Sequence, residues 1–145
     1  MNILILNGPN LNMLGIREPE VYGSKTYQDL ESYLHSFEDN YPVTIDVKQS
    51  NLEGLLIDIL HYANDHYDGV LFNAGAFTHY SYALYDAIKS ITIPVVEVHL
   101  SDITTREEFR KVSVIRNACV GSIMGLGFKS YEEGLKLLLK GRDEQ

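Results

Sequence analysis

Short apolar runs alternate along this chain with longer stretches in which hydrophobic residues recur at helical spacing. Five runs are candidate strands, and they cover residues 3–6, 43–47, 70–72, 93–98 and 119–124. Most of them are apolar almost without interruption, which is typical of strands covered on both faces, as in a parallel sheet. Pro94 has no amide to donate to a sheet ladder, so we expect it at the beginning of its strand.

The stretches between these runs predict helices, because each has apolar residues three and four positions apart. The expected apolar faces are Leu30, Leu34 and Phe37; Leu52, Leu56, Ile59 and Ala63; Leu84, Ala87 and Ile88; and Leu135, Leu138 and Leu139. A glutamate follows Ser50, Thr105 and Ser130 at three residues' distance, which predicts capping boxes there. Thr78 is the expected N-cap of the helix after the third strand.

The regular alternation of strands and helices predicts one α/β domain over residues 1–145. We expect a flavodoxin-like, doubly wound, five-stranded parallel sheet with helices on both faces. Residues 8–24 form a long connection after the first strand, and connections of this length usually act as lids or binding segments. Residues 141–145 are expected to form a frayed tail.

Composition and charge narrow the classes of partner. A hydrophobic fraction of 45% in 145 residues supports a real core, and no apolar run reaches the roughly 18 residues needed to cross a membrane. We therefore expect a cytoplasmic protein that binds no membrane. Cys119, the single cysteine, is expected as a buried thiol in the last strand. A net charge of −8 argues against nucleic acid, although a basic stretch from Arg106 to Arg116 suits a small anion.

Ligand sites in doubly wound sheets lie at the carboxyl ends of the strands, and reactive side chains follow two of the predicted strands. In the first connection, the Arg17 guanidinium would stabilise a Tyr22 phenolate and lower the pKa of the phenol. Composition alone favours an ordinary packed tyrosine, because the chain contains 10 of them. The motif in which Tyr22 lies, with Arg17 before it and Gly23 after it, favours the interpretation of Tyr22 as a base.

His99 ends the fourth predicted strand two residues after Glu97, so both side chains face the same side of the sheet. A carboxylate there orients the imidazole and keeps it protonated, as a general acid requires. The alternative is a strand-end histidine bonded only to backbone. Asn73 offers donor and acceptor groups to a polyol. Arg106 and Arg110 share a face if their segment is helical, where they bind an anion or pair with neighbouring acids.

The sequence predicts neither a metal site nor another cofactor. His61 and His66 are five positions apart and do not stack as a metal pair, and the glycine-rich segment 121–127 lacks the spacing of a dinucleotide loop. Two other classes of function stay open on these residues alone. A flavodoxin-like flavin or nucleotide module requires a phosphate-cradling loop after the first strand. A non-catalytic oligomerising scaffold gives no reason for acid–base residues to gather at strand ends.

Four motifs taken together resemble type II 3-dehydroquinate dehydratase, also called 3-dehydroquinase. They are N-G-P-N-L-N at 7–12, L-G-x-R-E-P-x-x-Y-G at 14–23, N-x-G-A-x-T-H at 73–79, and E-V-H-L-S with R-E-x-F-R over 97–110. The family is a hydro-lyase that dehydrates 3-dehydroquinate to 3-dehydroshikimate by anti elimination through an enolate. It acts in the shikimate pathway to aromatic amino acids or in quinate breakdown. The resemblance implies no cofactor and a homo-oligomer, a dodecamer built from trimers.

The resemblance also implies a role for each candidate residue. Tyr22 would remove the C2 proton, Arg17 would keep Tyr22 ionised, and His99, next to Glu97, would protonate the departing C1 hydroxyl. Asn12 would hold a water at the enolate oxygen. The implied substrate-binding residues are Asn73, His79, Arg106, Arg110, the amides of Leu100 and Ser101, and Asp86, which reaches a neighbouring subunit's site. Ala74 stands where the family often has proline, and residues 102–104 also depart from the common pattern; both departures concern affinity rather than reaction type.

Overall fold

Five strands form a single sheet in the order β2-β1-β3-β4-β5, and every neighbouring pair is parallel. The computed structural model describes residues 1–16, 20 and 24–143. The strands are β1 (Asn2–Asn7), β2 (Thr44–Gln49), β3 (Gly69–Asn73), β4 (Val95–His99) and β5 (Gly121–Met124). Since β1 pairs with β2 on one side and β3 on the other, the winding of the chain reverses between β1 and β3. Such a reversal opens a crevice at the carboxyl ends of the strands.

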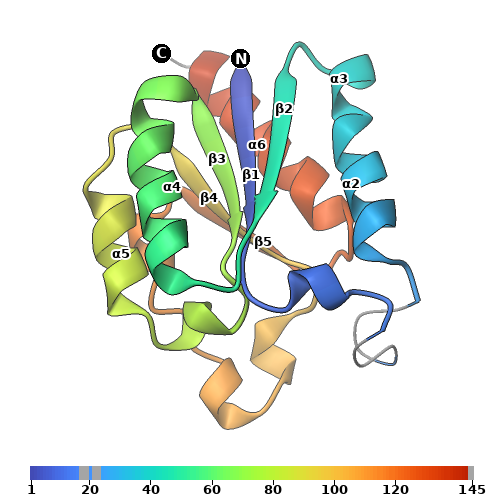
Figure 1. The fold of residues 1–145 in the computed structure, drawn as a ribbon, viewed down its shortest axis with the longest axis vertical. Coiled ribbons are helices and arrows are strands. Elements are labelled where there is room, and N and C mark those ends of the chain that lie inside the picture. Colours follow the sequence, from blue (N-terminus) through green and yellow to red (C-terminus); the bar gives the residue numbers. More distant parts are fainter. Residues whose placement is uncertain (17–19, 21–23, 144–145) are drawn as a thin grey trace.

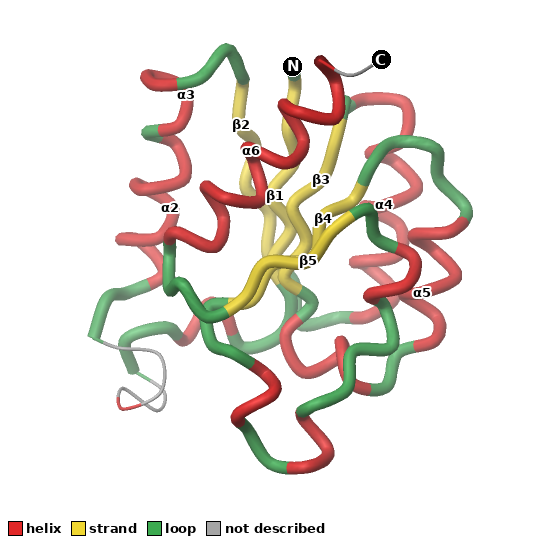
Figure 2. The backbone as a smooth tube through the Cα atoms, turned by 180° about the vertical axis from the view of Figure 1, so that it is seen from behind, coloured by secondary structure: helices red, strands yellow, loops and turns green. Residues whose placement is uncertain are grey.

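Helices cover both faces of the sheet, as the alternating sequence pattern predicts. They are α2 (Tyr27–His35), α3 (Phe37–Asn40), α4 (Glu53–His66), α5 (Tyr82–Lys89) and α6 (Lys129–Asp143). Figure 1 shows α4 and α5 on one face, with α2 and α6 on the other, and Figure 2 shows α6 lying across the sheet from behind. Among the helices of the described residues, none is both long and apolar enough to cross a membrane.

The run of apolar residues in β1 shows why apolar and polar residues do not alternate along the strands. Ile3 and Ile5 pack with α2 and α6, whereas Leu4 and Leu6 pack with α4 and α5, and all four are fully buried. Successive strand residues point to opposite faces, so both faces need apolar side chains when both are covered. Burying each such side chain stabilises the fold by about 1.5–3 kcal/mol relative to its exposure.

The predicted strands are all present with small shifts of their ends, and Pro94 directly precedes β4 as expected. The assignment of Cys119 to a strand is wrong. The Cys119 amide donates to the Arg116 carbonyl at 3.0 Å in a 3₁₀ turn, η5 (Arg116–Ala118), so β5 begins only at Gly121. The thiol is half-buried, and burial raises its pKa to about 12, so it stays protonated.

The predicted helix starts are wrong at Ser50 and Thr78, because Glu53, the expected partner of Ser50, bonds to a distant residue and the buried Thr78 hydroxyl has no hydrogen-bond partner among the described residues. The Ser50 hydroxyl accepts from the Leu52 amide before α4 begins, and the Glu53 carboxylate accepts from the Ser81 hydroxyl. Ser81, not Thr78, is the N-cap of α5 and accepts from the Leu84 amide.

Thr105 and Ser130 both lie in the described part of the chain, and neither forms the capping box predicted there. The Thr105 hydroxyl donates to the Asp102 carbonyl, and Ser130 lies inside α6, where its hydroxyl accepts from the Leu126 amide. The box is at Thr26 instead, where Thr26 and Asp29 satisfy each other's amides.

The ends of two helices also differ from expectation. On α4 the buried face is Leu56, Leu60 and Ala63, whereas Leu52 precedes the helix and is exposed. The last helix, α6, continues to Asp143, so residues 141–143 are helical rather than a frayed tail.

Candidate active site

A cleft lies at the carboxyl ends of β1, β3 and β4, where the winding of the sheet reverses. Both polar and apolar side chains line it, as is usual for sites that bind small molecules. Seven residues predicted from the sequence line it: Asn73, His79, His99, Leu100, Ser101, Arg106 and Arg110. The lining residues that sequence reasoning did not select are Pro9, Asn10, Leu11, Met13, Leu14, Gly75, Ala76 and Ile103.

The connections after β1 and β3 meet backbone to backbone beside the cleft. The Gly8 amide donates to the Asn73 carbonyl at 2.7 Å, and a Cβ at Gly8 would lie 2.6 Å from the Ala74 carbonyl oxygen. Gly75 has a φ of +59°, and a Cβ there would lie 3.0 Å from the Pro9 carbonyl oxygen. Glycine is therefore required at Gly8 by the close approach and at Gly75 by its backbone conformation.

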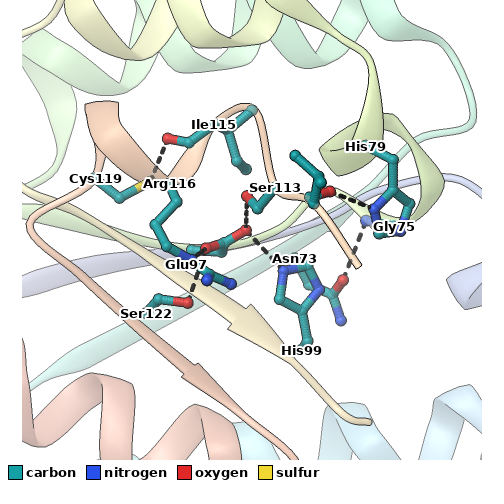
Figure 3. Close-up of polar contacts among 11 residues, drawn as sticks. Asn73, Gly75, His79, Glu97, His99, Ser113, Ile115, Arg116, Cys119 and Ser122 are labelled. Carbon is teal, nitrogen blue, oxygen red and sulfur yellow. Dashed lines mark hydrogen bonds and ion pairs between the residues drawn. The ribbon is translucent and has the colours of Figure 1, made fainter. Parts of the chain in front are cut away.

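A buried polar network fixes Asn73 in the wall of the cleft. The phenol of Tyr131, on α6, donates to Asn7 Oδ1 at 2.6 Å and accepts from Asn73 Nδ2 at 3.1 Å. Asn73 Oδ1 in turn accepts from the Gly75 amide at 3.2 Å (Figure 3). Burial raises the pKa of Tyr131, so the phenol stays neutral and donates. Sequence reasoning missed Tyr131, although its position four residues before Leu135 places it on the buried face of α6.

Glu97 and His99 face one another at the end of β4, as the two-residue spacing predicts. His99 Nε2 donates to Glu97 Oε2 at 2.8 Å, with Glu97 fully buried and His99 only 6% exposed (Figure 3). The same carboxylate accepts from the Ser113 and Ser122 hydroxyls and from Arg116. Sequence reasoning did not connect these three donors with Glu97, because they come from other segments.

The charge of Glu97 is stabilised by these donors. Burial alone would raise the pKa of the carboxyl, but the hydrogen bonds from His99, Ser113 and Ser122 outweigh burial and lower it to about 2. Glu97 is therefore ionised at neutral pH and holds the imidazole in one orientation. With Nε2 directed at Glu97, Nδ1 is the nitrogen left to exchange a proton with a ligand.

His79 lines the cleft from η2 (Gly75–His79) and is suited to accept a hydrogen bond. Its Nδ1 lies 2.8 Å from the Val112 carbonyl oxygen, which can only accept, so Nδ1 bears a hydrogen. Burial lowers the pKa of His79, and the backbone bond to Val112 opposes this only in part. The neutral ring then presents Nε2 as an acceptor, for example to a hydroxyl.

Arg106 and Arg110 line the cleft, but their segment is not the helix on which they would share a face. Two 3₁₀ turns, η3 (Ile103–Thr105) and η4 (Glu108–Arg110), replace the helix. Both guanidinium groups approach Glu107 Oε2, with Nε of Arg106 at 3.8 Å and Nε of Arg110 at 3.3 Å. Each arginine therefore both lines the cleft and pairs with a neighbouring acid.

Besides Glu97, which bonds to His99 but is not among the lining residues, four predicted residues are not placed in the cleft. Asn12, in η1 (Leu11–Met13), is exposed, and its Oδ1 lies 3.4 Å from Gln49 Nε2. Asp86 is exposed on α5. Neither is among the described residues that line the cleft. Arg17 and Tyr22 lie outside the described residues, so their predicted roles stay predictions.

Comparison with known proteins decides the family. The family model described as Dehydroquinase class II matches residues 1–139. The chain belongs to the class II dehydroquinase family. A 3-dehydroquinate dehydratase of Bacillus pumilus (strain SAFR-032) is 56% identical over 138 residues, covering 95% of this chain and 94% of that protein. One of Bacillus subtilis (strain 168) is 50% identical over 138 residues, covering 95% and 93%.

Solved structures agree with this assignment to the class II dehydroquinases. The crystal structure of type II dehydroquinase from Butyrivibrio crossotus DSM 2876 has a TM-score of 0.93 at 43% identity, covering 95% of this chain and 97% of that one. The structure of type II dehydroquinase from Propionibacterium acnes has a TM-score of 0.91 at 41% identity, covering 94% of each chain. The family resemblance and the flavodoxin-like fold predicted from the sequence are both confirmed.

Proposed function

We propose that this protein catalyses the dehydration of 3-dehydroquinate to 3-dehydroshikimate. Relatives named for that reaction match almost the whole chain. The observation that carries the proposal is the His99–Glu97 pair, because it presents a histidine held by a buried carboxylate to a cleft for a small molecule. The reaction serves aromatic amino acid biosynthesis or quinate breakdown.

The chemistry divides between one base and one acid. The Tyr22 phenolate takes a proton from C2, next to the ketone, and the electron pair forms an enolate. The enolate then collapses, the C1–oxygen bond breaks, and His99 gives a proton to the leaving hydroxyl, so that water departs. Arg17 keeps Tyr22 ionised. Groups acting as general acid or base contribute about 10²–10⁴-fold each.

The remaining site residues bind and polarise the substrate. Asn73, His79 and Arg110 accept or donate hydrogen bonds to ring hydroxyls, and Arg106 adds positive charge beside them. The amides of Leu100 and Ser101, which directly follow β4, hold the carboxylate. Asn12 holds a water at the enolate oxygen, where developing negative charge needs stabilisation.

The assembly and setting belong to the same proposal. The enzyme forms a dodecamer built from trimers, and Asp86, exposed on α5, reaches the site of a neighbouring subunit. Residues 8–24 act as a lid over the cleft. We expect the enzyme to work in the cytoplasm, without a cofactor and without binding nucleic acid.

A direct assay tests the proposal. Purified protein is mixed with 3-dehydroquinate, and the conjugated enone of the product is followed by ultraviolet absorbance. The wild-type protein should give a saturable rate, whereas Tyr22→Phe should lower kcat by at least about 10²-fold with an unchanged Tm. Absence of enone in the wild type would refute the function, and near-normal turnover of Tyr22→Phe would reject the base. A visible absorption spectrum checks the flavin alternative on the same sample.

A further inference from the structure

We propose that Arg116 is a positioning residue that makes His99 a stronger acid, by binding the Glu97 carboxylate on the side away from the imidazole. This role rests on the proposed function of His99. Arg116 lies in η5, 19 residues after Glu97, and the two are joined by the ion pair drawn in Figure 3. It is not among the residues that line the cleft, so it acts through Glu97 rather than on the substrate.

The two oxygens of Glu97 have separate partners. Oε2 accepts from His99 Nε2 and from the Ser113 hydroxyl. Oε1 accepts from Arg116 Nε at 3.1 Å and from the Ser122 hydroxyl at 2.8 Å. The carboxylate therefore stands between an imidazole on one oxygen and a guanidinium on the other. Its orientation is fixed from both sides, and the positive charge of Arg116 lies against the oxygen that the imidazole does not contact.

The guanidinium on Oε1 weakens the electrostatic attraction between the Glu97 carboxylate and a protonated His99. A carboxylate bonded only to His99 would hold the imidazolium strongly and make it a reluctant proton donor. The positive charge of Arg116 offsets much of that attraction, so the proton leaves His99 more readily. Charge-assisted bonds to Oε1 also keep Glu97 ionised, so the orientation of His99 is retained.

Other charged and titratable groups around the pair do not supply this effect. On the η2 side His79 is neutral because burial lowers its pKa, and Arg110 of η4 is paired with Glu107. Near Arg116, the Cys119 thiol stays protonated, and the Asp102 carboxylate accepts hydrogen bonds from the amide and the hydroxyl of Thr104. Among the described residues, Arg116 is the cation bonded directly to Glu97 besides His99.

The segment that ends in Arg116 also touches the substrate-binding histidine. The Val112 carbonyl accepts from His79, and the Val114 amide donates to the Thr78 carbonyl at 2.8 Å. If Arg116 only held this segment in place, replacing it would loosen the segment and raise KM. If Arg116 acts through its charge, replacing it would instead shift the pH profile of kcat. Measuring KM and the pH profile therefore separates the two roles.

The test compares Arg116→Gln, which removes the charge, with Arg116→Lys, which keeps it. The basic limb of the kcat profile reports loss of the proton from the acid. We expect this basic limb to move up by roughly 0.5–1 pH unit in Arg116→Gln. The shift is modest because the Arg116 charge is half-exposed and acts on His99 from the far side of the carboxylate, where solvent screens it in part. Arg116→Lys should move it by less than half as much. Ser122→Ala removes a neutral donor to the same oxygen and should also move it less than Arg116→Gln.

A readout that needs no turnover separates this inference from the proposed function. The ring C–H signal of His99, identified by its loss in His99→Asn, is titrated by NMR in wild type and Arg116→Gln. The inference predicts a higher titration midpoint in Arg116→Gln even if the wild type shows no dehydratase activity. Equal midpoints, or equal shifts in Arg116→Gln, Arg116→Lys and Ser122→Ala, would overturn it.

Discussion

Replacing Glu97 by glutamine is the sharpest test of how the site is held together. The side chain is fully buried and accepts hydrogen bonds from His99, Ser113, Ser122 and Arg116. Glutamine has nearly the same shape, but it is neutral and turns one acceptor into a donor. At least one of the four donors then faces another donor, and Arg116 loses the charge that it pairs with.

The pKa of Glu97 sets the size and the pH window of the effect. The pKa is lowered from 4.5 to about 2 in the folded state, so between these values the folded chain binds fewer protons than the unfolded chain. The resulting stability is fully present above pH 4.5 and is lost as the pH falls towards 2. It amounts to about 3 kcal/mol at pH 7 and to about 1 kcal/mol at pH 3.

The assay is urea unfolding followed by circular dichroism at one fixed protein concentration, at pH 7 and at pH 3. Glu97→Gln should be less stable than wild type by about 3 kcal/mol at pH 7, and the gap should shrink to about 1 kcal/mol at pH 3. Glu108→Gln is the matched control, because Glu108 is 90% exposed and pairs only at the surface with Lys111. If wild type and Glu97→Gln had the same free energy of unfolding at pH 7, or differed equally at both pH values, the reasoning would be refuted.

Three further predictions concern the loops around the cleft. Arg17→Ala should lower kcat by a larger factor than it raises KM in the enone assay; the reverse pattern would make Arg17 a binding residue. Ala74→Pro should raise the free energy of unfolding by about 0.4–1 kcal/mol, because its φ of −77° already suits proline and the preceding residue is in a strand; a loss of stability in urea would contradict this. Saturating 3-dehydroshikimate should slow tryptic cleavage within residues 8–24 if that segment is a lid, and equal cleavage with and without it would count against closure.

The parts of the fold that the sequence predicts are those that depend on neighbouring residues. β1 is readable because covering both faces of a sheet requires an uninterrupted apolar run, as Ile3 to Leu6 provide. The Glu97–His99 pair is readable because strand residues two apart share a face. Pro94 marks the start of β4 because it lacks an amide.

The parts that could not be predicted depend on distant segments. Ser113, Arg116 and Ser122 reach Glu97 from 16, 19 and 25 residues away, and Tyr131 meets Asn7 across 124 residues. The spacing of residues within one segment does not predict contacts between distant segments. The capping box predicted at Ser50 fails for the same reason, since Glu53 could cap its own helix but binds Ser81 instead.

The division of labour between base and acid is tested most directly by hydrogen exchange at C2 of 3-dehydroquinate in deuterated water, followed by NMR. His99→Asn lacks the acid but keeps the base, so it should exchange the C2 hydrogen well above the uncatalysed rate while forming almost no enone. Tyr22→Phe should do neither. Exchange at the wild-type rate in Tyr22→Phe, or none in a folded His99→Asn protein, would contradict the account.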